Sequence, residues 1–336
     1  MKITGTDIAI GQISDAGVFR DVLDYIYPQI SLPKKRSETV PAQHLDSLWV
    51  ATVGGVPAGR FSIYRNENLR YNGHPAFCIG HYECVDDEAT AATLLQHASQ
   101  YIRDKGGEYI IGPMNGSTWE NYRFATTSGQ GFFLEALQHN YYVAQWRQSG
   151  FGVIAEYGSH MDCDLPCDEE KLRQSVRELA AVGIRIRKVD LPDFAAELRR
   201  MFALCAESFQ YNFLFTPISE HDFIAKNLPV EPYLEPDLLW LACDANENIV
   251  GFIFALPDHE NASTKTAIVK TLCRLPGAAY YWVVPALCNQ LTQSARQRGY
   301  QRLIHAFMHK QNASMCVSAR FSGLAFKEYV LLGKRL

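Results

Sequence analysis

One order of predicted elements occurs twice along the chain, and this repetition limits the possible folds more than any other feature. LWVAT begins at Leu48, and the similar LWLAC begins 191 residues later at Leu239. The long helical pattern downstream of each segment ends at a glycine, Gly106 or Gly299, and these glycines are 193 residues apart. Because the order of elements and their spacing agree, we predict an internal duplication of one α/β unit.

Apolar periodicity and turn residues give the elements of each half. The first half is predicted to contain a strand at 8–13, a helix after Ser14, a hairpin at 48–64, strands at 76–85 and 108–112, and a helix between these two strands. The second half is predicted to contain strands at 184–189, 266–273, 302–308 and 326–333, a hairpin at 238–256, and helices at 194–209, from Ser219, at 285–298 and from Ala313. A proline and a charge run at 163–171 indicate the boundary, so we predict modules at 1–165 and 166–336.

Composition disfavours several classes of protein. The 336 residues carry a net charge of −4 with interspersed signs, which argues against a nucleic-acid partner. The longest apolar run, AAYYWVVPALC, is shorter than the roughly 18 residues of a membrane span, and the N-terminal sequence lacks the regions of a signal peptide. Nine cysteines are scattered, and Cys163 and Cys167 have no second pair, which disfavours zinc. We therefore expect a cytoplasmic protein without a metal or a membrane partner.

Polar and titratable residues crowd the end of an apolar strand in the segment RLIHAFMHKQN. Alternation places Leu303, His305 and Phe307 on one face of the strand and Ile304, Ala306 and Met308 on the other. The apolar Ile304 face should pack against helices. A histidine has an unperturbed pKa of about 6.5, which suits removal of a proton from an amine. His305 is therefore a candidate general base, and the alternative is a structural histidine hydrogen-bonded at a domain seam.

The element order and a short motif resemble the GNAT superfamily of acyl-CoA N-acyltransferases. The family has an asparagine after its fifth strand and a Gly-Phe pair eleven and twelve residues later; here Asn312 is followed by Gly323 and by Leu324 in place of phenylalanine. In the first half, Gly150-Phe151 supplies the pair. The resemblance implies two modules, each a twisted mixed sheet flanked by helices with its fourth and fifth strands splayed apart. The first module would carry an insertion at about 113–138.

The resemblance also implies an activity and a set of site residues. It implies transfer of an acyl group, with acetyl as the first expectation, from acetyl-CoA or another acyl-CoA to an amine of a small molecule. His305 would be the base, with backbone amides near Leu272 stabilising the oxyanion. The implied cofactor contacts are Thr271, Leu272, Cys273, Val283, Val284 and Asn312. Further catalytic candidates are Tyr329 and the pair His81 and Glu83, which lie two apart on a strand and so share one face.

Two departures from the family pattern concern the phosphate cradle and the catalytic acid. The family opens the helix after strand four with glycines that hold the pyrophosphate, whereas Trp282 and Val284 stand at those positions here. The first half has Asp86, Asp87 and Glu88 at its corresponding helix start, and these carboxylates repel a diphosphate. The tyrosine acid of the family is replaced by Ala319. We therefore expect weak binding of coenzyme A, in the second module if at all.

Two other functions remain open at this stage. An eroded GNAT pair would serve as a binding or scaffold protein without catalysis. A tandem GNAT protein could also be an aminoacyl transferase that uses charged tRNA, although the net negative charge weighs against this reading. The insertion stretch GSTWENYRF mixes aromatic and polar groups, as either a substrate lid or a packing segment would. The oligomeric state cannot be predicted.

Overall fold

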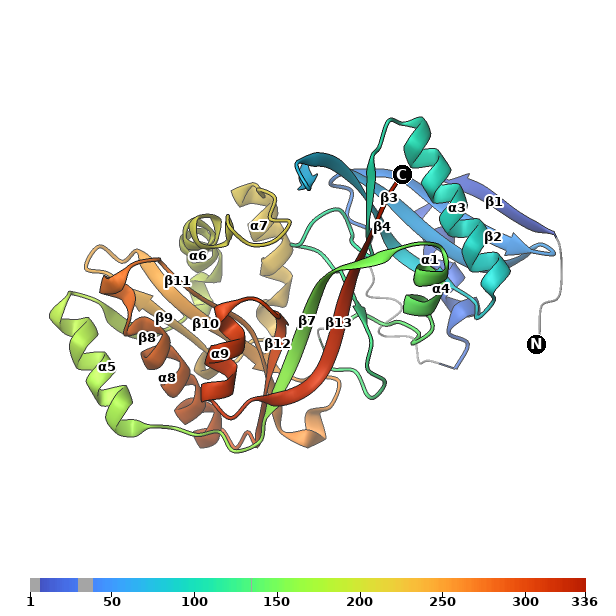
Figure 1. The fold of residues 1–336 in the computed structure, drawn as a ribbon. Coiled ribbons are helices and arrows are strands. Elements are labelled where there is room, and N and C mark those ends of the chain that lie inside the picture. Colours follow the sequence, from blue (N-terminus) through green and yellow to red (C-terminus); the bar gives the residue numbers. More distant parts are fainter. Residues whose placement is uncertain (1–6, 30–38, 134) are drawn as a thin grey trace.

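The structure, a computed structural model, describes residues 7–29, 39–133 and 135–336. These residues form one 13-stranded mixed sheet flanked by helices, with the strand order β1-β2-β3-β4-β5-β13-β7-β12-β11-β10-β9-β8 and β6 paired to β13 (Figure 1). The first half contains β1 (Ile8–Ile13), α1 (Ala16–Ile26), β2 (Leu45–Val53), β3 (Val56–Tyr71), β4 (His74–Cys84), α3 (Glu88–Asp104), β5 (Tyr109–Gly112), β6 (Phe124–Ala125), α4 (Tyr142–Gln148) and β7 (Gly152–Asp162). The predicted α/β class with two similar halves is confirmed.

Among the described residues, the second half repeats the order of the first with two additional helices, α5 and α7, and without a counterpart of the short strand β6. It contains α5 (Glu169–Ala181), β8 (Arg185–Lys188), α6 (Phe194–Phe209), α7 (Glu220–Asn227), β9 (Leu239–Cys243), β10 (Ile249–Pro257), β11 (Thr266–Arg274), α8 (Val283–Gln297), β12 (Arg302–His309), α9 (Ala313–Arg320) and β13 (Leu324–Arg335). No helix among the described residues is long and apolar enough to cross a membrane.

Helix ends follow the capping residues in the sequence. The Asp87 carboxylate accepts a hydrogen bond from Thr90 N at the start of α3, and the Ser219 hydroxyl accepts one from Asp222 N at the start of α7. Helix α5 was not predicted. Its first residues belong to the charge run at 163–171, which was interpreted only as the boundary between the modules. It is an amphipathic helix whose Leu179 is buried, so the charges form its solvated face.

The last strand of each half pairs with the other half. Strand β7 follows the first-half elements but pairs antiparallel with β12, placing His160 opposite His305. Strand β13 ends the chain and pairs antiparallel with β5, placing Leu332 opposite Gly112. The two strands also pair with each other, and Figure 1 shows both running through the middle of the molecule. This exchange joins the halves into one sheet, and the module boundary at residue 165 stays a prediction.

Strands four and five separate in both halves, as predicted. Strands β4 and β5 are parallel and pair only as far as Cys78 opposite Ile111. Strands β11 and β12 are parallel and pair only as far as Val269 opposite His305. Beyond these positions the two strands no longer bond to each other, so each half has an opening in its sheet where backbone groups need other partners.

The predicted alternation along β12 fails at a bulge. The pairing of β12 with β7 shifts between His305 and Met308, and Phe307 has a φ of 57°. Ile304 packs against Phe132 of the insertion rather than against helices, whereas Leu303 belongs to the core cluster that contains α8 residues. The predicted packing of the Ile304 face was therefore wrong, because the insertion covers that face of the strand.

Candidate functional site

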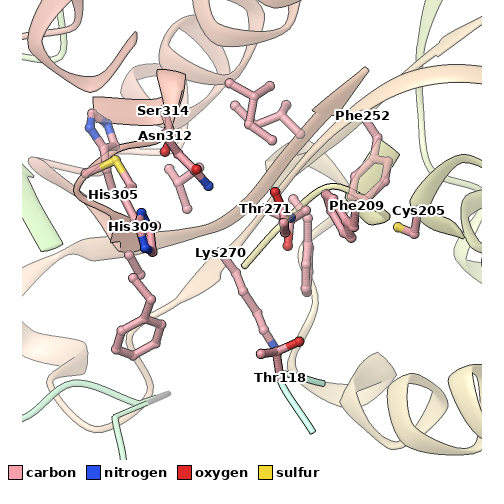
Figure 2. A pocket seen from close by; sticks show the side chains of 18 of the residues that line it. Thr118, Cys205, Phe209, Phe252, Lys270, Thr271, His305, His309, Asn312 and Ser314 are labelled. Carbon is pink, nitrogen blue, oxygen red and sulfur yellow. The ribbon is translucent and has the colours of Figure 1, made fainter. Parts of the chain in front are cut away.

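A cavity of about 480 Å³ opens where β11 and β12 separate. This volume lies within the range of about 300–1,000 Å³ typical of ligand pockets. Its walls come from β10, β11, β12, α6, α7 and α9 of the second half and from residues 118–123 of the first-half insertion. Figure 2 shows Asn312, His305 and His309 on one side of the cavity and Lys270 extending towards Thr118.

One end of the cavity is strongly apolar. Helix α6 contributes Leu198, Met201 and Phe209, helix α7 contributes Phe223, and strand β10 contributes Phe252. Leu198, Met201, Phe223 and Phe252 are buried, because α6 and α7 pack over the sheet and their apolar stripes face inward. This end of the cavity therefore suits a hydrocarbon chain better than a polar group.

The insertion loop is anchored to the second half. The Trp119 ring packs between Phe209, Phe215 and Phe223, and its Nε1 donates a hydrogen bond of 2.8 Å to the carbonyl of Thr216. Next to it, the Lys226 ammonium donates to the Glu120 carboxylate over 2.5 Å. These contacts fix the loop as part of the cavity wall, so residues from both halves form this cavity.

Lys270 is the extra residue of a β-bulge in β11. Thr271 pairs with Phe254 and Val269 pairs with Ala255, which leaves Lys270 without an opposite residue in β10. A bulge redirects a side chain, and the Lys270 side chain lines the cavity and is exposed to it. Partial desolvation by the cavity walls, followed by repulsion from Lys226, lowers the pKa of Lys270 to about 8.

His305 lines the cavity and takes part in a short polar chain. Its Nδ1 lies 2.7 Å from the Ser318 hydroxyl, which lies 2.9 Å from Nδ1 of His160 on the partner strand β7. Burial and the neighbouring His160 lower the pKa of His305 to about 4. His305 is therefore neutral at pH 7 and can accept a proton, although its low pKa makes it a weak base.

Asn312 occupies the N-cap position of α9 but does not cap the helix. Its side chain makes no cap hydrogen bond and lines the cavity instead. His309 also lines the cavity, with Nδ1 accepting a hydrogen bond from Gln311 N over 3.1 Å and its ring against Tyr157. The polar end of the predicted strand therefore faces the opening in the sheet.

The predicted cofactor contacts divide into two groups. Thr271 and Leu272 line the cavity, whereas the buried Cys273 belongs to the core cluster beneath α6. Val283 is fully buried, and a Cβ at Gly251 would clash with its side chain, so it packs onto the sheet. Val284 is partly buried against the same core cluster.

The first turn of α8 does not form the phosphate cradle of the family. Trp282 is the N-cap residue without a side-chain cap hydrogen bond, and Pro285 has no N–H to offer a phosphate. The opening between β11 and β12 can accommodate the pantetheine arm of an acyl-CoA and its acyl group. The residues therefore fit the acyl-pantetheine part of the cofactor and not its diphosphate.

The opening in the first half is filled by the insertion. Met114 N donates to the carbonyl of Ile79, and a Cβ at Gly80 would clash with Met114 and Asn115, so only glycine permits this close approach. The Asn115 amide contacts Nε2 of His81 at 3.0 Å. The insertion therefore closes one opening before its next residues line the cavity of the other half.

His81 and Glu83 have different hydrogen-bond partners among the described residues. The Nδ1 of His81 lies 2.9 Å from the Ser62 hydroxyl. The Glu83 carboxylate accepts hydrogen bonds from Tyr27 at 2.7 Å and from Tyr142 at 2.5 Å, and burial raises the pKa of both tyrosines. Neither residue lines the large cavity, and their predicted catalytic role stays a prediction.

Tyr329 is buried and also lies outside the large cavity. Its hydroxyl accepts a hydrogen bond of 3.3 Å from Ser159, and burial raises its pKa. It borders a smaller hollow of about 40 Å³ beside Glu135 and Arg123. Among the described residues, no group of three or more His, Cys, Asp or Glu side chains could hold a metal ion.

Sequence reasoning missed several residues of the cavity. Lys270 and Lys226 were not identified, and neither were the aromatic residues of α6 and α7 as cavity walls; Arg123 was noted only as part of GSTWENYRF. The mixture of aromatic and polar groups in GSTWENYRF was the one available signal, and residues 118–123 of that stretch do line the cavity. A single lysine in TAIVKTLC carries no comparable signal.

Two curated proteins resemble part of the sequence, and no family model matches it. Protein YghO of Escherichia coli strain K12 is 23% identical over 233 residues, which cover 64% of this chain and 55% of that protein. The bacterial ceramide synthase of Caulobacter vibrioides is 22% identical over 228 residues, which cover 64% of this chain and 57% of that protein. The chain thus spans little more than half of the length of either relative.

Solved structures match over nearly the whole chain. A GCN5-related N-acetyltransferase from Sphaerobacter thermophilus has a TM-score of 0.58 at 11% identity and covers 99% of this chain and 97% of its own. A tandem GNAT protein from the clavulanic acid biosynthesis pathway has a TM-score of 0.56 at 13% identity, with 98% coverage of both chains. A probable N-acyltransferase from Enterococcus faecalis has a TM-score of 0.61 at 10% identity, with 98% and 72% coverage. The chain therefore has a tandem GNAT fold.

Proposed function

We propose that the chain is an N-acyltransferase that transfers a long acyl group from a thioester to an amine of an amphiphilic molecule. The observation that carries this proposal is the opening between β11 and β12, which leads into a cavity with one strongly apolar end. The GNAT fold supports the reaction class, and the aromatic wall from α6 and α7 supports the long chain. An acetyl group would leave most of this apolar surface without a partner.

The proposed reaction forms one amide bond and breaks one thioester bond. The neutral amine attacks the carbonyl carbon, the C–S bond breaks, and the thiol leaves with a proton. Pairing of β11 with β12 ends at Val269, and backbone amides of β11 near Leu272 are proposed to stabilise the negative charge on the carbonyl oxygen. His305 is the proposed base, and Asn312 is proposed to contact the pantetheine arm at the mouth of the cavity.

The name of one sequence relative is consistent with this substrate class. A ceramide is an amide of a fatty acid with a long-chain amino alcohol, and the chain is 22% identical over 228 residues to a bacterial ceramide synthase. A cavity with an apolar end and a polar, titratable end fits the two parts of such an amphiphile. The proposal does not extend to the parts of that relative which this chain does not match.

The experiment is an acyl-transfer assay with palmitoyl-CoA and a long-chain amino alcohol. We expect an amide of the summed mass by mass spectrometry and release of one free thiol per amide. Acetyl-CoA should give less product than palmitoyl-CoA at equal concentration. A protein that forms no amide with any acyl donor would support the non-catalytic alternative and contradict the proposal.

A matched pair of variants connects the activity to the cavity. Ser314 lines the cavity at the start of α9, whereas the adjacent Ala313 is exposed and does not line it. Ser314→Trp should block the cavity and abolish transfer, and Ala313→Trp should retain it. Equal loss or equal retention in the two variants, at unchanged melting temperature, would place the reaction elsewhere.

A further inference from the structure

The large cavity contains more positive than negative side chains. Three cationic residues line it, Arg123, Lys226 and Lys270, and Glu120 is the one acidic residue in its lining among the described residues. Lys226 forms an ion pair with Glu120 over 2.5 Å, so this pair is neutral as a whole. Glu120 also attracts Lys270, but one carboxylate cannot balance three cations, so the cavity lining keeps an excess of positive charge at Lys270 and Arg123.

Neither remaining cation has an ion-pair partner among the described residues. The Lys270 ammonium makes no hydrogen bond to another described residue, and Figure 2 shows it extending into the cavity. The Arg123 guanidinium lies 3.8 Å from the ring centre of Tyr122 and 4.5 Å from that of Phe307, and it donates to the Phe307 carbonyl at 3.3 Å. These contacts orient Arg123 without neutralising it.

Cations that share one cavity repel one another, and Lys226 and Arg123 both act on Lys270 in this way. The Lys270 side chain is exposed to the cavity, so a ligand can reach its ammonium. A bound anion would relieve the repulsion through charge-assisted hydrogen bonds. The bulge that places Lys270 in the cavity would then serve recognition, because it turns a cation without an ion-pair partner among the described residues towards the ligand.

We propose that Lys270 and Arg123 form a subsite for an anionic group, such as a carboxylate, sulfonate or phosphate, on the amphiphilic substrate. The assignment to the amine acceptor rests on the proposed acyl-transfer function. The apolar wall of α6 and α7 would contact the hydrocarbon chain of the acceptor as well as the acyl chain, while Lys270 and Arg123 of the insertion loop hold the anionic group of the acceptor. The substrate class is thus a long-chain amine that also carries a negative charge, rather than an uncharged amino alcohol.

Binding of simple alkyl probes tests the subsite without any acyl transfer. Octyl sulfate and octan-1-ol share one chain and differ in charge, and isothermal titration measures the affinity of each for the full-length protein. We expect octyl sulfate to bind at least about tenfold more tightly, which corresponds to about 1.4 kcal/mol. Inorganic sulfate is the third probe. If it bound as tightly as octyl sulfate, the octyl chain would contribute nothing to binding, and the amphiphile assignment would be overturned.

Lys270→Met keeps the alkyl stem and removes the charge. It should bring the affinities for octyl sulfate and octan-1-ol to within about threefold of each other, while Lys270→Arg should retain most of the preference. Lys171→Met is the matched control, because Lys171 is exposed on α5 and does not line the cavity. The Lys270→Met protein should melt at the wild-type temperature or above it, since an unpaired charge has been removed.

The outcomes separate this inference from the proposed function. Equal binding of the two octyl probes to wild type, absence of binding by either, or an unchanged preference in Lys270→Met would each overturn the anionic subsite. Transfer to an uncharged long-chain amine without any anion preference would support the acyltransferase function and contradict the anionic subsite. An anion preference that depends on Lys270, in a protein that makes no amide, would support the subsite and contradict the acyltransferase function.

Discussion

At the scale of single residues, burial determines what His305 can do. Its ring lies between Ser318 and the paired strand β7, and burial together with His160 holds its pKa near 4. In the unfolded chain the same ring takes up a proton near its ordinary pKa of about 6.5. Protonation therefore favours the unfolded state between these two values, and the protein loses stability as the pH falls through this window.

The variant His305→Asn tests this assignment through stability. The urea midpoint of wild type should fall between pH 7 and pH 5, and that of the variant should fall less, because the proton uptake by the unfolded histidine is gone. Parallel curves for the two proteins would mean that His305 titrates alike in the folded and unfolded states.

The same variant tests catalysis through turnover per folded molecule. A lost general base costs roughly 10²–10⁴-fold in rate, whereas a structural histidine affects mainly the melting temperature. Undiminished turnover with a lowered melting temperature would assign His305 to the structure and leave the base to be found elsewhere in the cavity.

Local sequence motifs predicted some residues of the site. The positions of the others depend on contacts between segments that are distant in the sequence. Asn312 was found because its spacing to Gly323 resembles a family pattern, and both residues belong to one short segment. Lys270 was not found, because its position depends on a bulge and on a loop near residue 118, about 150 positions earlier in the sequence. Strand alternation also failed at Phe307, since a bulge depends on the paired strand as well as on local sequence.

At the scale of elements, the start of α8 limits how the proposed thioester donor could be bound. Its first turn offers bulky side chains and one proline where a diphosphate would need free N–H groups. Under the proposed function, the acyl-pantetheine part of the donor would therefore supply most of the affinity. Sequence alone could predict this element well, because the missing glycines lie within a single turn.

Comparison of two donors tests the role of the α8 start. Palmitoyl-CoA and palmitoyl-pantetheine differ only in the nucleotide and its phosphates, and we expect their dissociation constants to agree within about tenfold, or about 1.4 kcal/mol. Isothermal titration of both donors gives the ratio. A loss of several hundredfold on removing the nucleotide would reveal a phosphate site that α8 does not provide.

At the scale of the whole molecule, the exchange of β7 and β13 ties the two halves together. The first half alone would lack β13, which is the partner of both β5 and β7. The element order of each half was predictable from the sequence because it depends on local periodicity. The exchange was not, because β7 and β13 alternate in the same way whichever half they join.

Separate expression of residues 1–165 and 166–336 tests this dependence. Each fragment should aggregate or unfold, because exposed strand edges pair readily with other chains. Co-expression should restore a one-to-one complex by size-exclusion chromatography. A monomeric 1–165 fragment with a cooperative melting transition would show that the first half folds without β13.

During synthesis on the ribosome, the strand exchange delays the pairing of β5 with β13. Strand β5 ends at Gly112, and its partner β13 ends at Arg335, more than two hundred residues later. At roughly 5–20 residues per second, the open edge of β5 waits about 10–45 s for the strand that covers it. During that interval a nascent chain on a neighbouring ribosome could supply its own strand. A chaperone that covers the edge of β5 during synthesis should therefore raise the yield of folded protein without changing its stability.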